Sequence, residues 1–492
     1  MTLPAAIYSC SQVRAVDAHA IGTLGIPGYT LMTRAGEAAF RILRGRWPTA
    51  TRIAVVCGGG NNGGDGYVMA RIARAAGLAA RVLAVVPRRS LDGDAQRACD
   101  DFVASHGALE AFAAGAFGDA ELIVDALLGT GARAPLRDDA LAAIRAINGA
   151  GRPILALDLP SGLDGDSGLP LAEAVRADAT VTFVGLKSGL FLGDGPRYAG
   201  TIYCDELGIA APARPEFAPR LERILESEIA MALPRRARAA HKGTFGRVLI
   251  VGGGPGMPGA VRLAGDAALR VGAGLVVIAT APEHLTAVVA QRPELICRAV
   301  TEARQLEALI ADSDVIAVGP GLGRSDWARS MLALILAAAK PIVLDADALN
   351  LLAAHPLRRD DWILTPHPGE AARLLGLTVG AVQADRLAAL QALCGRYGGV
   401  TVLKGAGTLV GRAGETPGFC ERGNPGMASA GMGDVLTGAI VGVLAQCADQ
   451  RVAARVGVLA HALAGDAAAR GGERGLLASD VAKELRNQVN WP

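Results

Sequence analysis

A glycine-rich stretch late in the chain ends in an acidic residue and has the composition of a phosphoryl-transfer site. It reads Asn424-Pro-Gly-Met-Ala-Ser-Ala-Gly-Met-Gly-Asp434 and is followed at once by an apolar, helix-like run at residues 435–441. Gly431 and Gly433 permit a tight turn close to a ligand, and the N–H groups and positive dipole of the next helix attract an anion. Asp434 is then placed to accept a proton from a hydroxyl during phosphoryl transfer. For an isolated Gly-x-Gly-Asp, a loop with a helix-capping Asp is an equally good interpretation.

A second glycine-rich segment, residues 58–66, follows an apolar run at 52–57 that is typical of a buried parallel strand. A helical pattern then continues to residue 76. Strand, glycine loop and helix is the order in which open α/β sheets bind phosphates. Asn61, Asn62 and Asp65 add side-chain oxygens and amides, so this loop suits both a phosphate and a hard cation.

Two further predicted strands, residues 121–125 and 153–158, end in Asp125 and Asp158. The carboxyl ends of parallel strands line the ligand crevice, so these carboxylates and the loops that follow them should converge beside the Asn-Gly loop. Either aspartate alone also fits a turn former. Polar residues at three strand ends together favour a binding site.

The composition fits an α/β protein and argues against several functional classes. Among 492 residues only 4% are aromatic, whereas Gly (64) is abundant, as expected for strands and helices joined by tight turns. A net charge of +2 without a basic stripe argues against a nucleic-acid partner. No uncharged apolar run approaches the roughly 18 to 20 residues of a membrane helix, and the start lacks the basic segment of a signal peptide. We therefore expect a cytoplasmic protein without a membrane partner.

The 8 cysteines are scattered, with no Cys-x-x-Cys pair. This spacing argues against a disulfide framework or a structural zinc site. We expect most of these cysteines to be small buried hydrophobic side chains.

Prolines at positions 212, 215, 219 and 234 predict a linker between two domains. We expect a first domain at residues 1–212, a linker without strands at 213–227 and a second domain at 228–492. In the second domain, predicted strands alternate with helices, which indicates another largely parallel sheet between helix layers. These strands lie at residues 247–251, 275–279, 315–319, 341–344 and 400–403.

Three basic side chains have competing interpretations. Lys404 follows a predicted strand and precedes two glycines, so it fits either a phosphate contact or a structural lysine at a strand end. His367 lies between two prolines in a rigid loop, which favours a ligand contact over a solvated histidine. His19 has no metal-ligand spacing near it and is predicted to be a surface or packing residue.

The first half carries a set of motifs in a fixed order: Tyr8-Ser9 with Gln12-Val-Arg14 and Asp17, Gly60-Asn-Asn-Gly-Gly-Asp-Gly66, Asp125-Ala-Leu-Leu-Gly-Thr-Gly131, Asp158-Leu-Pro-Ser-Gly-Leu-Asp164 and Thr182-Phe-Val-Gly-Leu-Lys187. Over nearly all of residues 1–210 the chain resembles the NAD(P)H-hydrate epimerase family, which has a Rossmann-like three-layer α/β fold. The resemblance implies a K⁺ site at Asn62, Asp125 and Ser161, and we assign Asp158 as the acid/base that opens the hydrated ring. It implies that the hydrated dinucleotide is bound by Asn61, Asn62, Gly63, Gly64, Asp65, Gly129, Thr130, Gly131, Ala132, Arg133, Ala134, Pro135 and Asp158.

The second half likewise carries Gly272-Ala-Gly-Leu-Val276, Asp345-Ala-Asp-Ala-Leu-Asn350, Thr365-Pro-His-Pro-Gly-Glu370, Lys404-Gly-Ala-Gly-Thr408 and the 424–434 stretch, in that order. Residues 228–492 thereby resemble the ribokinase-like NAD(P)H-hydrate dehydratase family, although Val261 and Gly265-Asp266 depart from its usual pattern. The resemblance implies that Asp434 is the catalytic base. It implies an adenine-nucleotide site at Lys404, Gly405, Ala406, Gly407, Thr408 and Gly433, and a hydrated-substrate site at Ala260, Gly321, His367 and Asp434.

The fusion of both halves resembles the bifunctional NAD(P)H-hydrate repair enzymes. The resemblance implies epimerisation of R- and S-NAD(P)HX, followed by Mg²⁺-assisted phosphorylation of the S epimer and loss of phosphate. Its bacterial branch uses ADP and leaves AMP, and its eukaryotic branch uses ATP. We expect a homo-oligomer whose partners are NADHX, NADPHX and ADP.

Two rival interpretations remain. A vitamin-precursor kinase of the same superfamily would share Gly-x-Gly-Asp but would lack the first half and the Asn-Pro-Gly-Met-Ala-Ser run. A messenger-decapping scaffold would reuse the first half as a binding module. The presence of Asn62, Asp125, Asp158 and Ser161 argues against the scaffold.

Overall fold

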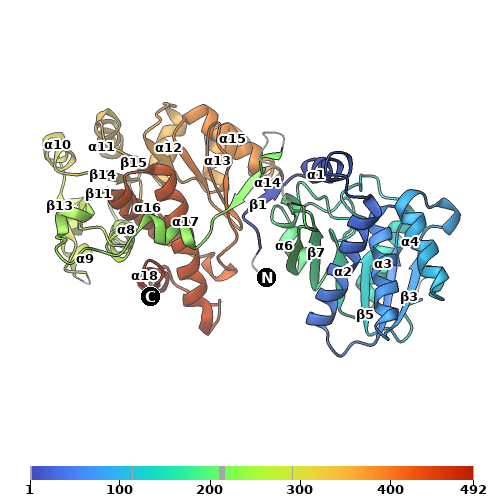
Figure 1. Cartoon of the computed structure of the whole chain (residues 1–492). Helices are drawn as coiled ribbons and strands as arrows, with labels where there is room; N and C mark the ends of the chain where they lie inside the picture. Colours follow the sequence, from blue (N-terminus) through green and yellow to red (C-terminus); the bar gives the residue numbers. More distant parts are fainter. Residues whose placement is uncertain (1–2, 114, 210–216, 291, 491–492) are drawn as a thin grey trace. The chain divides into compact units, whose positions relative to one another are not determined.

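In the computed structural model the chain divides into two units, Met1–Leu221 and Glu222–Pro492 (Figure 1). The structure describes residues 3–113, 115–209, 217–290 and 292–490. Each unit has its own hydrophobic core, so each is described by itself. The division falls inside the predicted linker, of which residues 213–216 lie outside the described residues. The predicted domain bounds at 212 and 228 stay predictions.

The first unit is built on a parallel sheet in the order β4-β3-β2-β5-β6-β7-β9. Its strands are β2 (Arg52–Cys57), β3 (Ala79–Ala84), β4 (Ala108–Ala111), β5 (Leu122–Ala126), β6 (Ile154–Leu157), β7 (Ala179–Phe183) and β9 (Thr201–Asp205). The central strands β5, β6 and β7 are fully buried, as expected for parallel strands that are covered on both faces. A separate short pair is formed by β1 (Ala6–Tyr8) and β8 (Leu186–Lys187).

Helices on the two sides of this sheet belong to different core clusters. One cluster joins alternate strand residues, such as Val55 and Val124, to α1 (Cys10–Gly22), α2 (Gly28–Arg46), α3 (Asn61–Ala75) and α4 (Gly93–Ala104). The other joins the intervening residues, such as Ala54 and Ile123, to α5 (Asp138–Gly149). A short helix, α6 (Gly195–Ala199), precedes β9. The three-layer arrangement predicted for this half is confirmed.

The second unit contains a sheet in the order β13-β12-β11-β14-β15-β16-β17-β18-β19, with β10 paired to β19. The pairs from β13 to β17 are parallel, and the β17–β18 and β18–β19 pairs are antiparallel. The strands are β10 (Leu221–Arg223), β11 (Arg247–Val251), β12 (Leu275–Thr280), β13 (Ile296–Ala299), β14 (Val315–Val318), β15 (Ile342–Leu344), β16 (Trp362–Leu364), β17 (Val400–Leu403), β18 (Thr408–Arg412) and β19 (Gly418–Cys420).

Two helix layers enclose this sheet, as Figure 1 shows. One layer shares a core cluster with the strands and consists of α7 (Ser227–Ala232), α8 (Pro258–Arg270), α9 (Leu285–Val289), α16 (Met432–Cys447), α17 (Gln450–Ala468) and α18 (Ala478–Gln488). The other consists of α10 (Ala303–Ala311), α11 (Asp326–Ala337), α12 (Ala346–Ala354), α13 (Pro368–Leu375), α14 (Val379–Ala384) and α15 (Arg386–Tyr397).

One helical stretch among the described residues, Gln450–Gly471, is long and apolar enough to cross a membrane, but 67% of its apolar window is buried inside the structure. Its apolar surface therefore packs in the core of the second unit.

In both sheets the chain reverses its direction of strand addition once. The reversal lies between β2 and β5 in the first unit and between β11 and β14 in the second. The loops after such adjacent strands diverge and leave a crevice at the carboxyl edge of the sheet, where α/β proteins bind ligands. These two edges therefore position the candidate sites.

Two local expectations need correction. Residues 61–65, expected to lie in a loop, form the first turn of α3, because the turn after β2 is completed by Gly58, Gly59 and Gly60 alone. The segment expected to contain no strands includes β10. Only Leu221 of its three residues is apolar, so no periodic pattern marks this strand.

Candidate active sites

The first unit contains a cavity of about 690 Å³ at its switch point. Its wall includes the turn after β2, the start of α3, the loop after β5, parts of α1 and α2, and the end of β7. Predicted site residues that line the cavity are Asn61, Asn62, Asp65, Gly129, Thr130, Gly131, Ala132 and Asp158.

The other predicted residues of this half lie outside the cavity lining. A Cβ at Gly63 would stand 2.2 Å from the carbonyl oxygen of Gly58, so this glycine lets α3 pack against the turn after β2. A Cβ at Gly64 would stand 2.5 Å from Met32. The remaining residues outside the lining are Arg133, Ala134 and Pro135. A substrate contact for these five residues stays a prediction.

A buried ion pair joins Asp158 to Lys187 at one end of the cavity. The Lys187 ammonium is 1% exposed and also donates to Thr182 Oγ1 (3.0 Å) and to the Phe183 carbonyl (2.6 Å). Asp158 has a positive φ of 64°, which aspartate adopts more readily than most residues. Such strained positions cluster at functional sites, where the surrounding structure holds them in place.

Three further aspartates line the same cavity: Asp17, Asp65 and Asp94. Burial, opposed by Lys187 and reinforced by the charge of Asp158, raises the pKa of Asp17 to about 6. Burial, with Asp158 and Asp17, raises the pKa of Asp65 well above its usual value. Lys187 therefore shares the cavity with four aspartates, and burial raises the pKa of two of them, Asp17 and Asp65.

The three residues predicted to hold a cation also meet beside the cavity. Ser161 Oγ donates to Asp125 Oδ1 (2.6 Å), and the Ser161 backbone N–H donates to Asp125 Oδ2 (2.8 Å). Asn62 Nδ2 donates to the Leu128 carbonyl (2.9 Å), which leaves the buried Asn62 Oδ1 without a hydrogen-bond partner in the described part of the chain. Burial raises the pKa of Asp125 to about 6, although hydrogen bonds from Ser161 oppose this.

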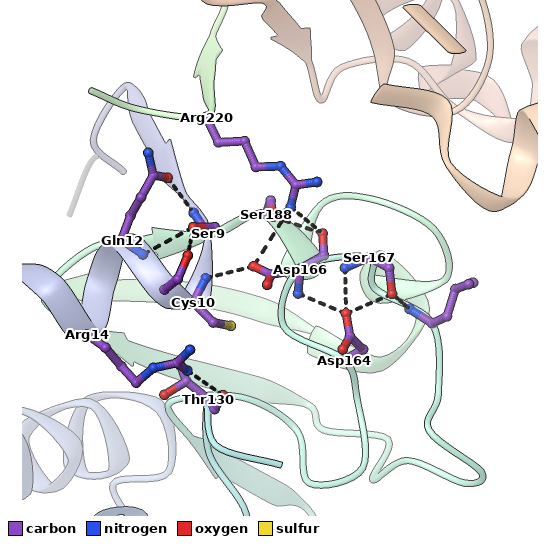
Figure 2. A network of polar contacts seen from close by, with 12 residues as sticks. Ser9, Cys10, Gln12, Arg14, Thr130, Asp164, Asp166, Ser167, Ser188 and Arg220 are labelled. Carbon is purple, nitrogen blue, oxygen red and sulfur yellow. Dashed lines mark hydrogen bonds and ion pairs between the residues drawn. The ribbon is translucent and has the colours of Figure 1, made fainter. Parts of the chain in front are cut away.

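Figure 2 shows how α1 is fixed beside this cavity. Ser9 and Gln12 cap the helix reciprocally, and the Cys10 N–H donates to Asp166 Oδ1 (2.7 Å). Arg14 Nη1 donates to the Thr130 carbonyl (2.9 Å), which ties the helix to the loop after β5. The N-terminal motif therefore serves first to hold α1 in place.

In the second unit, Gly431 and Asp434 form the start of α16. Gly431 is the N-cap residue with φ 86°, and a Cβ at this position would approach Leu263 to 2.6 Å. Asp434 follows in the first helical turn. Burial, reinforced by Asp345 and opposed by Lys404, raises the pKa of Asp434 to about 7. A carboxyl group with this pKa can exchange a proton near neutral pH.

Asp345, at the end of β15, joins three elements of this site. Its carboxylate accepts from Lys404 Nζ (2.7 Å), Thr437 Oγ1 (2.8 Å) and Thr365 Oγ1 (2.9 Å). Lys404 follows β17 and Thr437 belongs to α16, so one buried carboxylate fixes both relative to the sheet. Burial alone would lower the pKa of Lys404, but Asp345 and Glu370 raise it above its usual value.

His367 and Glu370 cap α13 reciprocally. His367 Nδ1 accepts from the Gly369 N–H (2.9 Å), and Glu370 Oε2 accepts from the His367 N–H (2.8 Å). The His367 side chain is 51% exposed, and burial together with Lys404 lowers its pKa. Burial raises the pKa of Glu370 to about 7 despite Lys404, which lies 3.8 Å away.

Arg386 binds the backbone of the predicted nucleotide loop, residues 404–408. This arginine donates to the carbonyls of Leu403 (3.2 Å), Lys404 (3.3 Å) and Gly407 (3.2 Å). Gly405 has φ 141°, and a Cβ there would meet the guanidinium at 2.5 Å. The backbone of Gly405, Ala406 and Gly407 is therefore fixed next to Lys404, while Thr408 begins β18.

Three other predicted residues of this half, Gly433, Gly321 and Ala260, have close neighbours that the structure describes. A Cβ on Gly433 would lie 3.4 Å from Lys404 Nζ, so the missing side chain leaves room beside the ammonium group. A Cβ on Gly321 would lie 3.1 Å from the Cβ of Ala260, which places these two residues together at the switch point. Of the departures from the family pattern, Val261 is buried under the Gly252 turn and Asp266 pairs with Arg292 (3.0 Å).

Helix α17 supplies two contacts that the sequence analysis did not identify. Asp466 accepts from the Gly423 N–H (3.1 Å) and Asn424 Nδ2 (3.0 Å), which holds the start of the 424–434 stretch. His461 is hydrogen-bonded to the backbone of Met432, and burial lowers its pKa to about 4. In the sequence, the sign of a contact by His461 is that it is a lone histidine in the apolar run 458–464.

Comparisons with known proteins agree with this two-site arrangement. A family model described as NAD(P)H-hydrate dehydratase matches residues 248–487, and one described as YjeF-related protein N-terminus matches residues 28–189. The bifunctional NAD(P)H-hydrate repair enzyme Nnr of Coxiella burnetii is 48% identical over 98% of this chain and 99% of its own length. The chain belongs to the bifunctional NAD(P)H-hydrate repair enzyme family. The Escherichia coli Nnr protein is 41% identical over 100% of this chain and 95% of its own.

Solved structures confirm the ribokinase-like fold of the second half. The ADP/ATP-dependent NAD(P)H-hydrate dehydratase of Bacillus subtilis, co-crystallised with ATP and Mg²⁺, is 30% identical with a TM-score of 0.50 and covers 54% of this chain and 96% of its own. Because the family relatives span both halves, the vitamin-kinase and scaffold interpretations are both disfavoured.

Proposed function

We propose that this chain repairs hydrated nicotinamide cofactors at two separate sites. The first unit interconverts the R and S epimers of NAD(P)HX, and the second converts S-NAD(P)HX to NAD(P)H with ADP, giving AMP and phosphate. The proposal rests chiefly on the position of Asp434, which lies at the start of α16 beside the Lys404–Asp345 pair. The first unit of the same chain has its own polar cavity.

The chemistry of the second unit starts from a poor leaving group. A ring hydroxyl departs readily once it is phosphorylated, with assistance from the ring nitrogen. Asp434 takes the hydroxyl proton, while the backbone N–H groups at the start of α16 stabilise the transferring phosphoryl group. Lys404, held by Asp345, supplies positive charge next to Gly433 and the nucleotide loop.

The second site also has a carboxyl group suited to a cation. Glu370 has a pKa raised to about 7 by burial, and a bound Mg²⁺ would favour its ionised form. Mg²⁺ at a phosphoryl-transfer site neutralises charge on the donor oxygens. We expect ADP rather than ATP as the donor because the chain resembles the bacterial branch of the family.

In the first unit, Asp158 is the proposed acid/base, and Lys187 positions it. One observation supports Asn62, Ser161 and Asp125 as the K⁺ ligands. The buried Asn62 Oδ1 lacks a hydrogen-bond partner among the described residues, and Asn62 and Ser161 both contact the Leu128 carbonyl, while Ser161 also binds Asp125. Amide, hydroxyl and carboxylate oxygens suit a large monovalent cation. Bound K⁺ would add positive charge next to the substrate and stabilise the loop after β5. We also propose a cytoplasmic location and a homo-oligomeric state for this protein.

The deciding experiment supplies purified protein with R- or S-NADHX, ADP and Mg²⁺ and follows reduced-nicotinamide absorbance together with AMP. We expect S-NADHX to be converted directly with one AMP per NADH, and R-NADHX to be converted only as fast as it is epimerised. NADH formation from S-NADHX without any nucleotide would refute the phosphorylation step. Complete persistence of R-NADHX would refute the epimerase assignment.

A further inference from the structure

Two carboxyl groups that line the cavity of the first unit, Asp17 and Asp94, have no role in the proposed chemistry, and of these Asp17 interacts electrostatically with both Lys187 and Asp158. Asp17 comes from α1 and lines the same cavity as Asp158, Lys187 and Asp65. The nearby polar side chains of its motif anchor the helix, since Ser9 and Gln12 form the cap and Arg14 binds Thr130 (Figure 2). Asp17 makes no hydrogen bond or ion pair with any residue in the described ranges.

Helix α1 is fixed at several points and directs one unpaired carboxyl group, that of Asp17, into the cavity. This arrangement positions the carboxyl group for a role in the cavity. A purely structural aspartate would be expected to have a partner, because burying a carboxyl group without one is costly. The charged groups that act on Asp17 are Lys187 and Asp158, and Asp17 in turn acts on Asp65.

The reaction itself calls for two proton-transfer groups. When the hydrated ring opens, the hydroxyl proton leaves, a C=O bond forms, and the electron pair of the breaking C–N bond goes to the ring nitrogen, which must gain a proton. Reclosure on the other face of the aldehyde reverses both transfers and gives the other epimer. The overall process is an isomerisation, so it needs neither an oxidant nor a reductant.

We propose that Asp17 is a second catalytic residue of the epimerase site and delivers the proton to the ring nitrogen while Asp158 accepts the proton of the ring hydroxyl. This inference rests on the epimerase function proposed above. The division of roles follows from the cavity: Asp158 is paired with the Lys187 ammonium and is therefore the acceptor, whereas Asp17 has no cation within hydrogen-bonding distance. Burial raises the pKa of Asp65, so this group suits a hydrogen-bond donor.

The test uses the full chain and purified R-NADHX, with ADP and Mg²⁺ present so that epimerisation limits the appearance of NADH. Asp17→Asn should lower kcat for R-NADHX by about 100-fold or more, the usual contribution of a general acid. Its KM for R-NADHX should stay within about threefold, and conversion of S-NADHX should be unchanged. Asp17→Glu, which keeps the carboxyl group, should recover at least about a tenth of the wild-type kcat.

The pH profile separates a catalytic role from a structural one. Burial raises the pKa of Asp17 to about 6, so the wild-type kcat should fall as pH rises above 6, and Asp17→Asn should lose this descending limb. Asp119→Asn, an aspartate with a side chain 77% exposed, is the matched control and should behave as wild type. An Asp17→Asn enzyme with near wild-type kcat, or one that is slower but keeps the descending limb, would overturn the inference. Failure of the wild-type protein to convert R-NADHX would instead refute the proposed epimerase function.

Discussion

The ammonium group of Lys404 lies 2.7 Å from Oδ1 of Asp345, and the two side chains are only 16% and 2% exposed. The same carboxylate also accepts from Thr437 in α16, so strands β15 and β17 and the helix that carries Asp434 share one polar centre. A buried pair of this kind holds its neighbours in place, and removing one member leaves the other charge uncompensated.

Asp345→Ala is therefore expected to destabilise the second unit by about 3 to 5 kcal/mol. Urea denaturation of the full chain, with hydrogen exchange of residues 222–492 to assign the transition, measures this loss. Asp312→Asn removes an aspartate that is 74% exposed and paired with Arg247, so it should cost less than about 1 kcal/mol. Equal effects of the two variants would show that the buried pair has no special part in stability.

Asp434→Asn should abolish formation of NADH from S-NADHX while leaving epimerisation of R-NADHX intact. The pKa of Asp434 is raised to about 7, so a base in this position is mostly protonated at pH 6 and mostly ionised at pH 8. The wild-type dehydration rate should rise with pH through about 7 and then level off. Stopped-flow absorbance with S-NADHX and ADP measures the profile, and Asp326→Asn, with a side chain 95% exposed, is the control. A rate independent of pH between 6 and 8 would remove Asp434 as the base.

Lys187→Met should slow the epimerase reaction by at least about 100-fold, because it removes the ammonium group that pairs with the Asp158 carboxylate and positions it. Methionine keeps most of the apolar part of the side chain, while the buried hydrogen bonds of Lys187 to Thr182 and to the Phe183 carbonyl are lost with the charge. Epimerisation is followed by chromatographic separation of R- and S-NADHX without ADP. Arg152→Met changes an exposed cation of the same unit and should leave the rate unchanged. Normal epimerisation by Lys187→Met would exclude a positioning role for this lysine.

Epimerisation should be faster in K⁺ than in an equal concentration of a bulky organic cation, and Asn62→Ala should remove most of this difference. The substitution deletes the unpartnered Oδ1 that the proposed K⁺ site requires. Initial rates at constant ionic strength measure the effect. Ser11→Ala, which changes an exposed side chain on α1, should keep the full K⁺ response. An Asn62→Ala enzyme that still responds fully to K⁺ would place the cation elsewhere.

Much of the fold follows from local sequence. Strands β2, β11 and β17 begin and end at the predicted residues, because a parallel strand covered on both faces is a nearly continuous apolar run. Short strands such as β10 and β19 were missed, since a strand of three residues has no detectable period. The first turn of α3 was mistaken for a loop because its asparagines and glycines are poor helix formers that tertiary packing retains.

The sequence also predicted where polar side chains gather at the carboxyl edges of the two sheets, because the positions that carry polar residues at strand ends can be read directly. It did not reveal which polar groups pair. Lys187 lies 29 residues from Asp158, and Thr437 lies 92 residues from Asp345, so these bonds depend on the packing of whole elements. Lys404 was equally compatible with a structural and a phosphate-binding role, and its ion pair with Asp345 shows a structural contact without testing the second role.

The left-handed backbone of Asp158, with φ 64°, decides how its chemistry should be probed. Alanine tolerates this conformation poorly, so an alanine variant would mix the loss of a carboxylate with a distorted chain at the floor of the cavity. Asparagine adopts such a conformation more readily and has nearly the same shape. Asp158→Asn therefore removes the negative charge while the backbone conformation and the shape of the side chain are kept. Asp158→Gly would remove the side chain and also free the backbone.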